Sequence, residues 1–303
     1  MFLYAIFLSL LSSFGTPNVP APAIEPASLY ISTDNGQSWN GFAKGLPSDL
    51  MVRDVLEHDG AIFLTAIKQG VYILDEGADT WRLSNTGLPI KLDSRAIPLA
   101  NNLVAEFFPT SLAANGDQLI IGTFNNGAYH SNDGGKSWKQ ATTNIDDVVG
   151  SLLFTDDILI AGTHMGIWES KDRGVNWKLR CETGFRINAV SMHNGQLHVA
   201  RQNGMGVLSG DNIDWSDMET GWAIIQLQKH DDDLYAITAK NEVFRTKSGK
   251  FWENNKFAIK GLPAKNLPEA LWNGLNPQLP GETAAGLVTE TSRGWIVGRT
   301  SGC

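Results

Sequence analysis

The chain has 303 residues, of which 42% are hydrophobic and 18% charged, so it can bury a sizeable core within one body. Its net charge of −8 and the lack of any run of Lys and Arg exclude nucleic acid or an anionic membrane surface as the main partner. The presence of only two cysteines, Cys181 and Cys303, excludes a disulfide scaffold.

The first segment, Met1–Phe14, is apolar and carries no charged side chain. It is shorter than the roughly 20 residues that span a bilayer as a helix, and the small-residue site Ala21-Pro22-Ala23 follows it. We therefore predict a secretory signal at residues 1–23 and a single domain at 24–303 with no membrane span. The expected location is secreted, periplasmic or at the cell surface. A buried apolar N-terminal strand is the alternative, because the segment lacks the basic residue usual near the start of a signal.

The pattern Ser-x-Asp-x-Gly-x-x-Trp, which we call the box, recurs along the chain. Its tryptophans, together with those of three worn copies at Trp81, Trp215 and Trp252, are 42, 57, 39, 38 and 37 residues apart. A recurrence near forty residues indicates a radial array of similar units. The complete copies are Ser32, Asp34, Gly36 and Trp39; Ser131, Asp133, Gly135 and Trp138; and Ser170, Asp172, Gly174 and Trp177.

Each unit reads as four short strands separated by turn residues. In the third unit the strands are expected at Thr110–Ala114, Gln118–Thr123, Ala128–Ser131 and Ser137–Gln140. Such a sequence predicts an antiparallel meander, and meanders repeated around an axis form a β-propeller. The same order of signals begins near Val52, Val148, Ile187 and Ile224.

The two ends of the chain supply one more unit between them. Gly286–Thr291 and Trp295–Gly298 read as first and second strands, and the third strand that should follow is Leu29–Ser32. We therefore predict an all-β, six-bladed propeller of four-stranded antiparallel blades, closed by a blade that both termini share. Lys260–Thr283 contains four prolines and is interpreted as a loop rather than a seventh blade.

Within the box each residue type has a mechanical role. The glycine allows a positive φ in the hairpin between the third and fourth strands. The Asp and Ser side chains hydrogen-bond to the backbone of the turn, and the Trp buries a large apolar area. These boxes resemble the Asp-box, or bacterial neuraminidase repeat, of sialidases, sortilin-type receptors and photosystem II assembly factors. The resemblance implies that the box residues are structural, and we assign no catalytic residue.

A sialidase-like glycoside hydrolase is the first alternative function. The sialidase family carries a Phe/Tyr-Arg-Ile-Pro motif, and the nearest match here, Phe185-Arg186-Ile187-Asn188, lacks the proline. The family's nucleophile is a tyrosine, whereas Tyr30, Tyr72 and Tyr129 fall on third strands and Tyr235 on a second strand, away from the axis. Asp93 and Glu106 are the carboxylates that such a hydrolase would use as acid and base.

Ligand binding is expected on the face opposite the boxes. Two insertions, 90–108 and 260–283, enlarge the links between blades there, and long loops on a rigid scaffold often carry function. Arginines near a channel mouth can hold a carboxylate or phosphate with their planar forks. The alternative is that the loops only cap the ring and each arginine pairs with a nearby carboxylate. The candidates are Arg53, Asp93, Arg95, Asn125, Asn126, His164, Arg186, Arg201 and Arg299.

The leading hypothesis is non-enzymatic binding of a protein or glycan partner through this face. A scaffold factor resembling the photosystem II assembly propellers is the further alternative. The sequence contains no phosphate loop, dinucleotide fingerprint or metal-ligand spacing, so we predict no cofactor and no metal. The two cysteines fall in blades on opposite sides of the predicted ring, so we expect two free thiols or a partner for Cys303 outside this chain.

Overall fold

The computed structural model describes residues 27–90, 107–124, 127–141, 145, 148–216, 218, 220–240, 242–247, 253–254 and 285–299. All regular elements in these ranges are β-strands. Within them, no helix has the length and apolar character that crossing a membrane would need.

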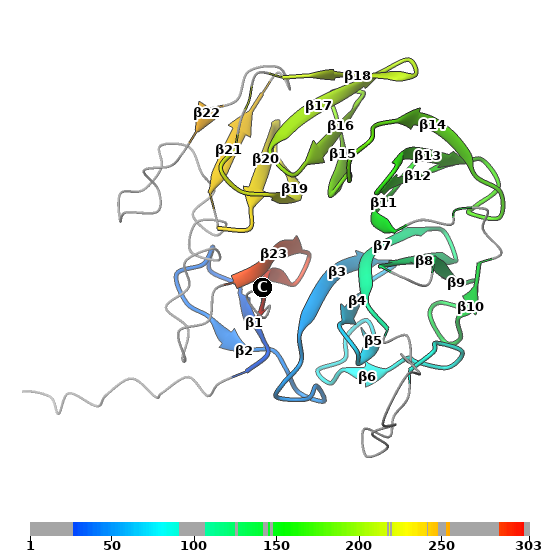
Figure 1. The fold of residues 1–303 in the computed structure, drawn as a ribbon. Helices are drawn as coiled ribbons and strands as arrows, with labels where there is room; N and C mark the ends of the chain where they lie inside the picture. The colour runs from blue at the N-terminus through cyan, green and yellow to red at the C-terminus, as the bar shows by residue number, and fades with distance from the viewer. Residues whose placement is uncertain are drawn as a thin grey trace, which may run out of the picture.

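Six four-stranded antiparallel sheets surround a central axis, which confirms the predicted propeller (Figure 1). The strand nearest the axis is the first of each blade: β23, β3, β7, β11, β15 and β19. From the axis outward, blade one is β23 (Ala285–Thr291), β24 (Gly294–Arg299), β1 (Leu29–Ser32) and β2 (Asn40–Gly41). Blade two is β3 (Val52–His58), β4 (Ala61–Ala66), β5 (Gly70–Leu74) and β6 (Arg82–Leu83). Blade three is β7 (Pro109–Asn115), β8 (Gln118–Thr123), β9 (Ala128–Ser131) and β10 (Lys139–Gln140).

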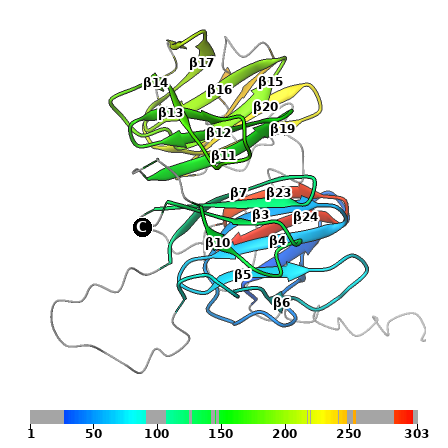
Figure 2. The same ribbon diagram turned by 90° about the vertical axis from the view of Figure 1, so that its right-hand side faces the viewer.

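The remaining three blades follow the same plan. Blade four is β11 (Val149–Thr155), β12 (Ile158–Thr163), β13 (Gly166–Ser170) and β14 (Lys178–Glu182). Blade five is β15 (Ala189–His193), β16 (Gln196–Arg201), β17 (Gly204–Ser209) and β18 (Asn212–Trp215). Blade six is β19 (Ile224–His230), β20 (Asp233–Thr238), β21 (Val243–Thr246) and β22 (Glu253–Asn254). Seen from the side, the strands of neighbouring blades are stacked as layers (Figure 2).

The ring closes through the blade built from both ends of the chain. Strand β1 pairs antiparallel with β24, placing Leu29 opposite Gly298 and Ser32 opposite Trp295. This pairing confirms the predicted closure. Because every strand edge in a blade then faces a neighbour or the short outer strand, closure limits the free edges of the sheet.

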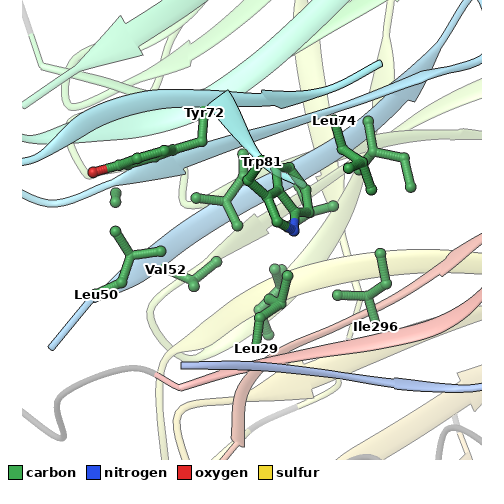
Figure 3. Packing of buried hydrophobic residues seen from close by; sticks show 12 residues of the cluster. Leu29, Leu50, Val52, Tyr72, Leu74, Trp81 and Ile296 are labelled. Carbon is green, nitrogen blue, oxygen red and sulfur yellow. The ribbon is translucent and has the colours of Figure 1, made fainter. Parts of the chain in front are cut away.

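The core is a series of apolar layers between neighbouring blades. Between blades one and two, Leu29 and Ile296 lie opposite Val52, Leu74 and Trp81 (Figure 3). All five of these side chains are buried. Burial of such side chains contributes about 1.5–3 kcal/mol each, so the seams between blades hold most of the apolar stabilisation.

The complete boxes share one geometry. In blade three, the Ser131 hydroxyl donates to Asp133 Oδ1 at 2.7 Å and accepts the Gly135 N–H at 2.8 Å. Asp133 also accepts the N–H of Ser137 at 2.9 Å. Gly135 has a φ of 78°, and Trp138 is buried against blade two. The turn is therefore held by its own side chains, and its tryptophan secures it to the preceding blade.

Blade five departs from the predicted pattern. Its third and fourth strands meet at a tight turn, Gly210–Asp211, and the strand pairing puts Ile213 at the place that Trp138 has in blade three. Trp215 lies two residues further along, so its interpretation as a worn copy of the box tryptophan is wrong in register. The tighter hairpin is the physical reason, because it removes the residues that separate the turn from the tryptophan elsewhere.

Candidate functional site

The inner strands enclose a channel that holds a cavity of about 300 Å³. Every blade contributes to its wall, and most of the polar groups come from the starts of the inner strands. The polar lining residues are Arg53, Asp54, Thr110, Ser111, Ser151, Asn188, Gln226, Gln228, Lys229 and Thr289.

One position of the inner strand ties four of the blades to the next blade. Strand pairing makes Asp54, Ser111, Ser151 and Gln226 equivalent. Each of these side chains hydrogen-bonds to the backbone of the following inner strand, where a buried amide group needs a partner. The bonds join Asp54 Oδ2 to the Leu112 N–H (2.6 Å), Ser111 Oγ to the Leu152 N–H (3.0 Å), Ser151 Oγ to the Val190 N–H (3.2 Å) and Gln226 Nε2 to the Val288 carbonyl (2.7 Å).

Asp54 has a second task in this ring. Leu287 is the equivalent residue in blade one, and its side chain has no acceptor for the N–H of Val55. Asp54 Oδ1 accepts that N–H itself at 2.9 Å. Burial raises the pKa of Asp54 to about 6, although the N–H donors of Leu112 and Val55 favour the ionised form. The carboxylate is thus held by structural bonds rather than presented to a substrate.

The face opposite the boxes, formed by the loops between second and third strands and by the links between blades, is called the link face here. Three of the large apolar side chains exposed in the described residues lie on it: Phe124 (49% exposed), Met165 (45%) and Trp222 (50%). They belong to blade three, blade four and the link into blade six. The other three are Leu83 and Leu179 on outer strands and Val175 in a box turn.

Cations lie over the aromatic rings of this face. The Arg186 guanidinium is 5.6 Å from the ring centre of Phe124, and Lys240 Nζ is 5.1 Å from that of Trp222. Arg201 lies 4.4 Å from the ring centre of Trp215 and 5.0 Å from that of Phe185. Such contacts contribute roughly 0.5–2 kcal/mol and fix long side chains that would otherwise move freely.

The predicted candidates are therefore distributed rather than gathered. Arg53 lines the channel, Arg186 and Arg201 stack on aromatic rings, and His164 is exposed on the link face. The remaining candidates lie outside the described residues, namely Asp93, Arg95, Asn125 and Asn126 together with the Arg299 side chain. The same holds for the signal at 1–23, for Cys303, and for most of both insertions.

The tyrosines occupy the interior of the blades. Tyr30, Tyr72 and Tyr129 lie on third strands and Tyr235 on a second strand, and all four are buried. Within the part of the chain that the structure describes, none lines the channel. Cys181 is a buried free thiol whose pKa is raised by burial and by the nearby Asp211. No group of three His, Cys, Asp or Glu side chains there is placed to hold a metal ion.

The sequence analysis missed Phe124 and Trp222. Their signal is that an aromatic residue stands in a loop or link, outside the alternation that the strands require. It also missed the recurrence of Gly-Leu-Pro at Gly45 and Gly87. Both glycines have a φ near 90° and lie against the backbone of the next blade's tryptophan, Trp81 or Trp138.

Comparison with solved structures shows the propeller fold. YCF48 bound to a D1 peptide is 14% identical, with a TM-score of 0.50 over 92% of this chain and 96% of that one. The extracellular domain of a putative one-component system from B. thetaiotaomicron is 12% identical, with a TM-score of 0.63 over 91% of this chain and 35% of that one. No protein-family model matches the chain, and no curated protein matches its sequence.

Proposed function

We propose that this chain is an exported Asp-box propeller that binds a partner protein through its link face. The supporting observation is the group of exposed apolar side chains on that face, with cations stacked beside them. Exposed apolar groups of this kind mark interaction sites, and aromatic and Arg side chains supply most hot spots of protein interfaces.

The cation–aromatic contacts favour recognition over catalysis. Arg186 and Lys240 are already positioned by Phe124 and Trp222, so less side-chain freedom is lost when a partner binds. Their charge suits a partner segment that carries carboxylates. YCF48 has been solved with a peptide bound, so peptide binding is within the capacity of a propeller ring.

The test is an affinity capture with matched variants of the purified chain. The bait is the wild type, the double variant F124A/W222A, or the control L83A, which removes an equally exposed side chain from an outer strand. A protein retained by the wild type and by L83A but lost with F124A/W222A supports the proposal. That protein is then purified and titrated, and an unchanged affinity for F124A/W222A would contradict it.

Two alternatives are tested beside it. A glycan partner would appear on a glycan array as binding that F124A/W222A loses, because aromatic rings also suit stacking on sugars. A sialidase-like hydrolase would release fluorophore from aryl sialosides above a heat-denatured control. In the described residues no tyrosine lies where that mechanism needs its nucleophile.

A further inference from the structure

A second cavity, of about 350 Å³, lies on the opposite side of the molecule from the link face, in the seam between blades three and four. Blade three contributes the turn at Asp117, Gln118 and the third-strand residue His130, and blade four contributes its box turn at Arg173 and Gly174. Cavities of roughly 300–1,000 Å³ are typical of small-molecule sites.

The chain contains a matched example of the same seam in closed form. Between blades two and three, strand pairing makes Ala61, Ile73 and Ser84 the counterparts of Gln118, His130 and Ala141. There Ile73 is buried within the apolar cluster, and the Ser84 hydroxyl donates to the Gly135 carbonyl of the box turn. The closed seam is therefore apolar and sealed.

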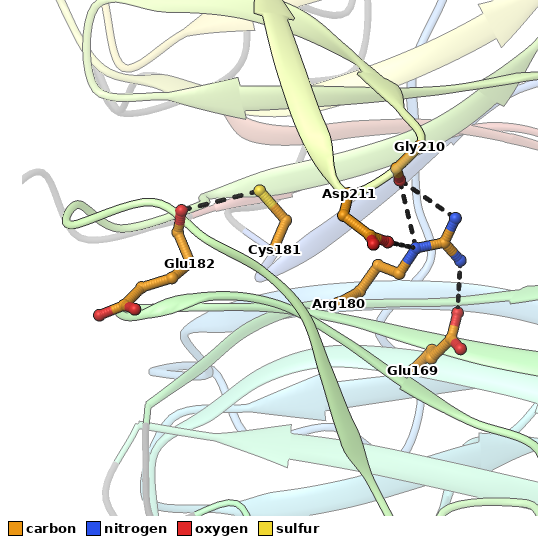
Figure 4. Close-up of polar contacts among 6 residues, drawn as sticks. All are labelled: Glu169, Arg180, Cys181, Glu182, Gly210 and Asp211. Atoms are coloured by element: carbon orange, nitrogen blue, oxygen red, sulfur yellow. Dashed lines mark hydrogen bonds and ion pairs between the residues drawn. The ribbon is translucent and has the colours of Figure 1, made fainter.

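The seam between blades four and five is polar but satisfied. Glu169 stands at the position of His130 and accepts from Arg180 Nη1 at 2.8 Å (Figure 4). The same guanidinium donates to Asp211 at 2.8 Å and to the Gly210 carbonyl of blade five. The polar group of this seam thus has a partner within the protein.

The seam between blades three and four has neither solution. Its three substitutions replace an isoleucine by His130, an alanine by Gln118 and the bridging serine by Ala141. Gln118 is only 5% exposed, and its Nε2 donates to the Arg173 carbonyl at 2.8 Å. Its Oε1 is buried, and no protein group donates to it. A buried amide oxygen without a donor is costly, which is unusual at a surface built only for packing.

We propose that this cavity binds a neutral sugar residue. Gln118 Oε1 needs a donor, which a sugar hydroxyl supplies, while the other polar groups of the wall include both donors and acceptors. Asp117 and Arg173 carry opposite charges, so the wall favours neither an anion nor a cation. Ala141 and the 54%-exposed Val175 offer apolar surface to the C–H groups of the ring. This site is separate from the link face and does not rest on the function proposed for it.

The experiment follows the side-chain amide signal of Gln118 in nitrogen–proton NMR spectra during titration. The ligands are glucose, galactose, mannose, xylose and N-acetylglucosamine, with glucosamine as a cation and glucuronate and sialic acid as anions. Oligosaccharides that end in the best monosaccharide distinguish a glycan terminus from a free sugar. At least one neutral sugar is expected to shift the Gln118 signal with a millimolar or tighter Kd.

Variants taken from the closed seam provide the controls. Q118A and H130I reproduce blade two and should weaken sugar binding at least tenfold, measured by ligand-observed NMR. A141S introduces the hydroxyl of Ser84 and is the milder variant if H130I unfolds, which thermal unfolding reports. F124A, on the link face, should leave sugar affinity within twofold of wild type, so the two proposals fail separately. The inference is overturned if no neutral sugar binds, if only charged sugars bind, or if the variants that remain folded bind as the wild type does.

Discussion

The α-carbon of Gly87 lies against the carbonyl of Trp138, in the next blade, so closely that a Cβ at Gly87 would overlap that oxygen. The Trp138 N–H in turn donates to the carbonyl of Thr86 at 2.8 Å. Gly87 has a φ of +88°, a conformation that side chains disfavour. The link after blade two is therefore fitted to the box of blade three through backbone alone.

We predict that Gly87→Ala destabilises the ring by more than about 1 kcal/mol, because strain at φ and the overlap with Trp138 add together. Gly116→Ala is the matched control, since Gly116 also has a positive φ (54°) but nothing within 4 Å of a Cβ. Urea denaturation of both variants measures the difference. Equal losses would show that the close approach carries no energetic weight.

The box carboxylates predict sensitivity to acid. Hydrogen bonds, first of all from the Ser137 hydroxyl, lower the pKa of Asp133 to about 2, and the Ser38 hydroxyl does the same for Asp34. A lowered folded pKa gives stability that is present above pH 4 and is lost as the pH falls towards 2. In Asp133→Asn the decrease in melting temperature between pH 4 and pH 2 should be smaller than in the wild type. An unchanged pH profile would mean that this turn contributes nothing to acid unfolding.

Asp54 predicts the opposite dependence. Its pKa is raised to about 6 by burial, so the stability linked to its protonation is present below pH 4 and is lost as the pH rises through 6. Asp54→Asn removes this titration but also weakens one of the bonds to Val55 and Leu112. The variant should therefore be less stable than the wild type at pH 4, with a smaller gap at pH 8. Chemical denaturation across this range checks the sign, and a gap that widens with pH would refute it.

His198 is a buried polar residue where other blades have apolar ones. Strand pairing makes it equivalent to Ile120, Ile160 and Ile296, and neither of its ring nitrogens has a partner in the described residues. The sequence analysis assigned no role to it. The ring is 1% exposed and stacks on His193 with centroids 5.6 Å apart.

We predict that His198→Ile stabilises the protein, and increasingly so at low pH. Burial, with the neighbouring His193, lowers the pKa of His198 to about 4, so its contribution is kept above pH 6.5 and lost as the pH falls through 4. Melting temperatures of the variant and the wild type from pH 7 to pH 4 give the comparison. A variant that melts lower than the wild type at pH 4 would contradict the prediction.

How far the sequence predicts the structure depends on the kind of signal. The box residues and strand alternation were enough for six blades and for the closing blade, because each turn and strand carries a local signature such as Gly135 or Ser131. The register of blade five was missed, since the tight turn at Gly210–Asp211 leaves no mark on the spacing of Trp215. Relations between blades, such as Asp54 with Leu112, have no local signature and follow only from the curvature of the ring.

The candidate site shows the same division. Loop positions on the link face were predictable from the meander, and His164, Arg186 and Arg201 do belong to its loops and links. The partners of the arginines were not, because Arg186 meets Phe124 from a different blade. Gln118 could be recognised only by comparing equivalent seams, which requires the strand pairing of blades two, three and four.

The pairing of β1 with β24 has a consequence for how the protein is made. Leu29 leaves the ribosome among the first residues of the folded body, yet its partner Gly298 is synthesised some 270 residues later. Blade one therefore cannot form while the chain is growing, and the apolar seam that Leu29 shares with Val52 stays open until the end of translation. For a chain that has to cross a membrane before it folds, this delay keeps the nascent protein from closing too early.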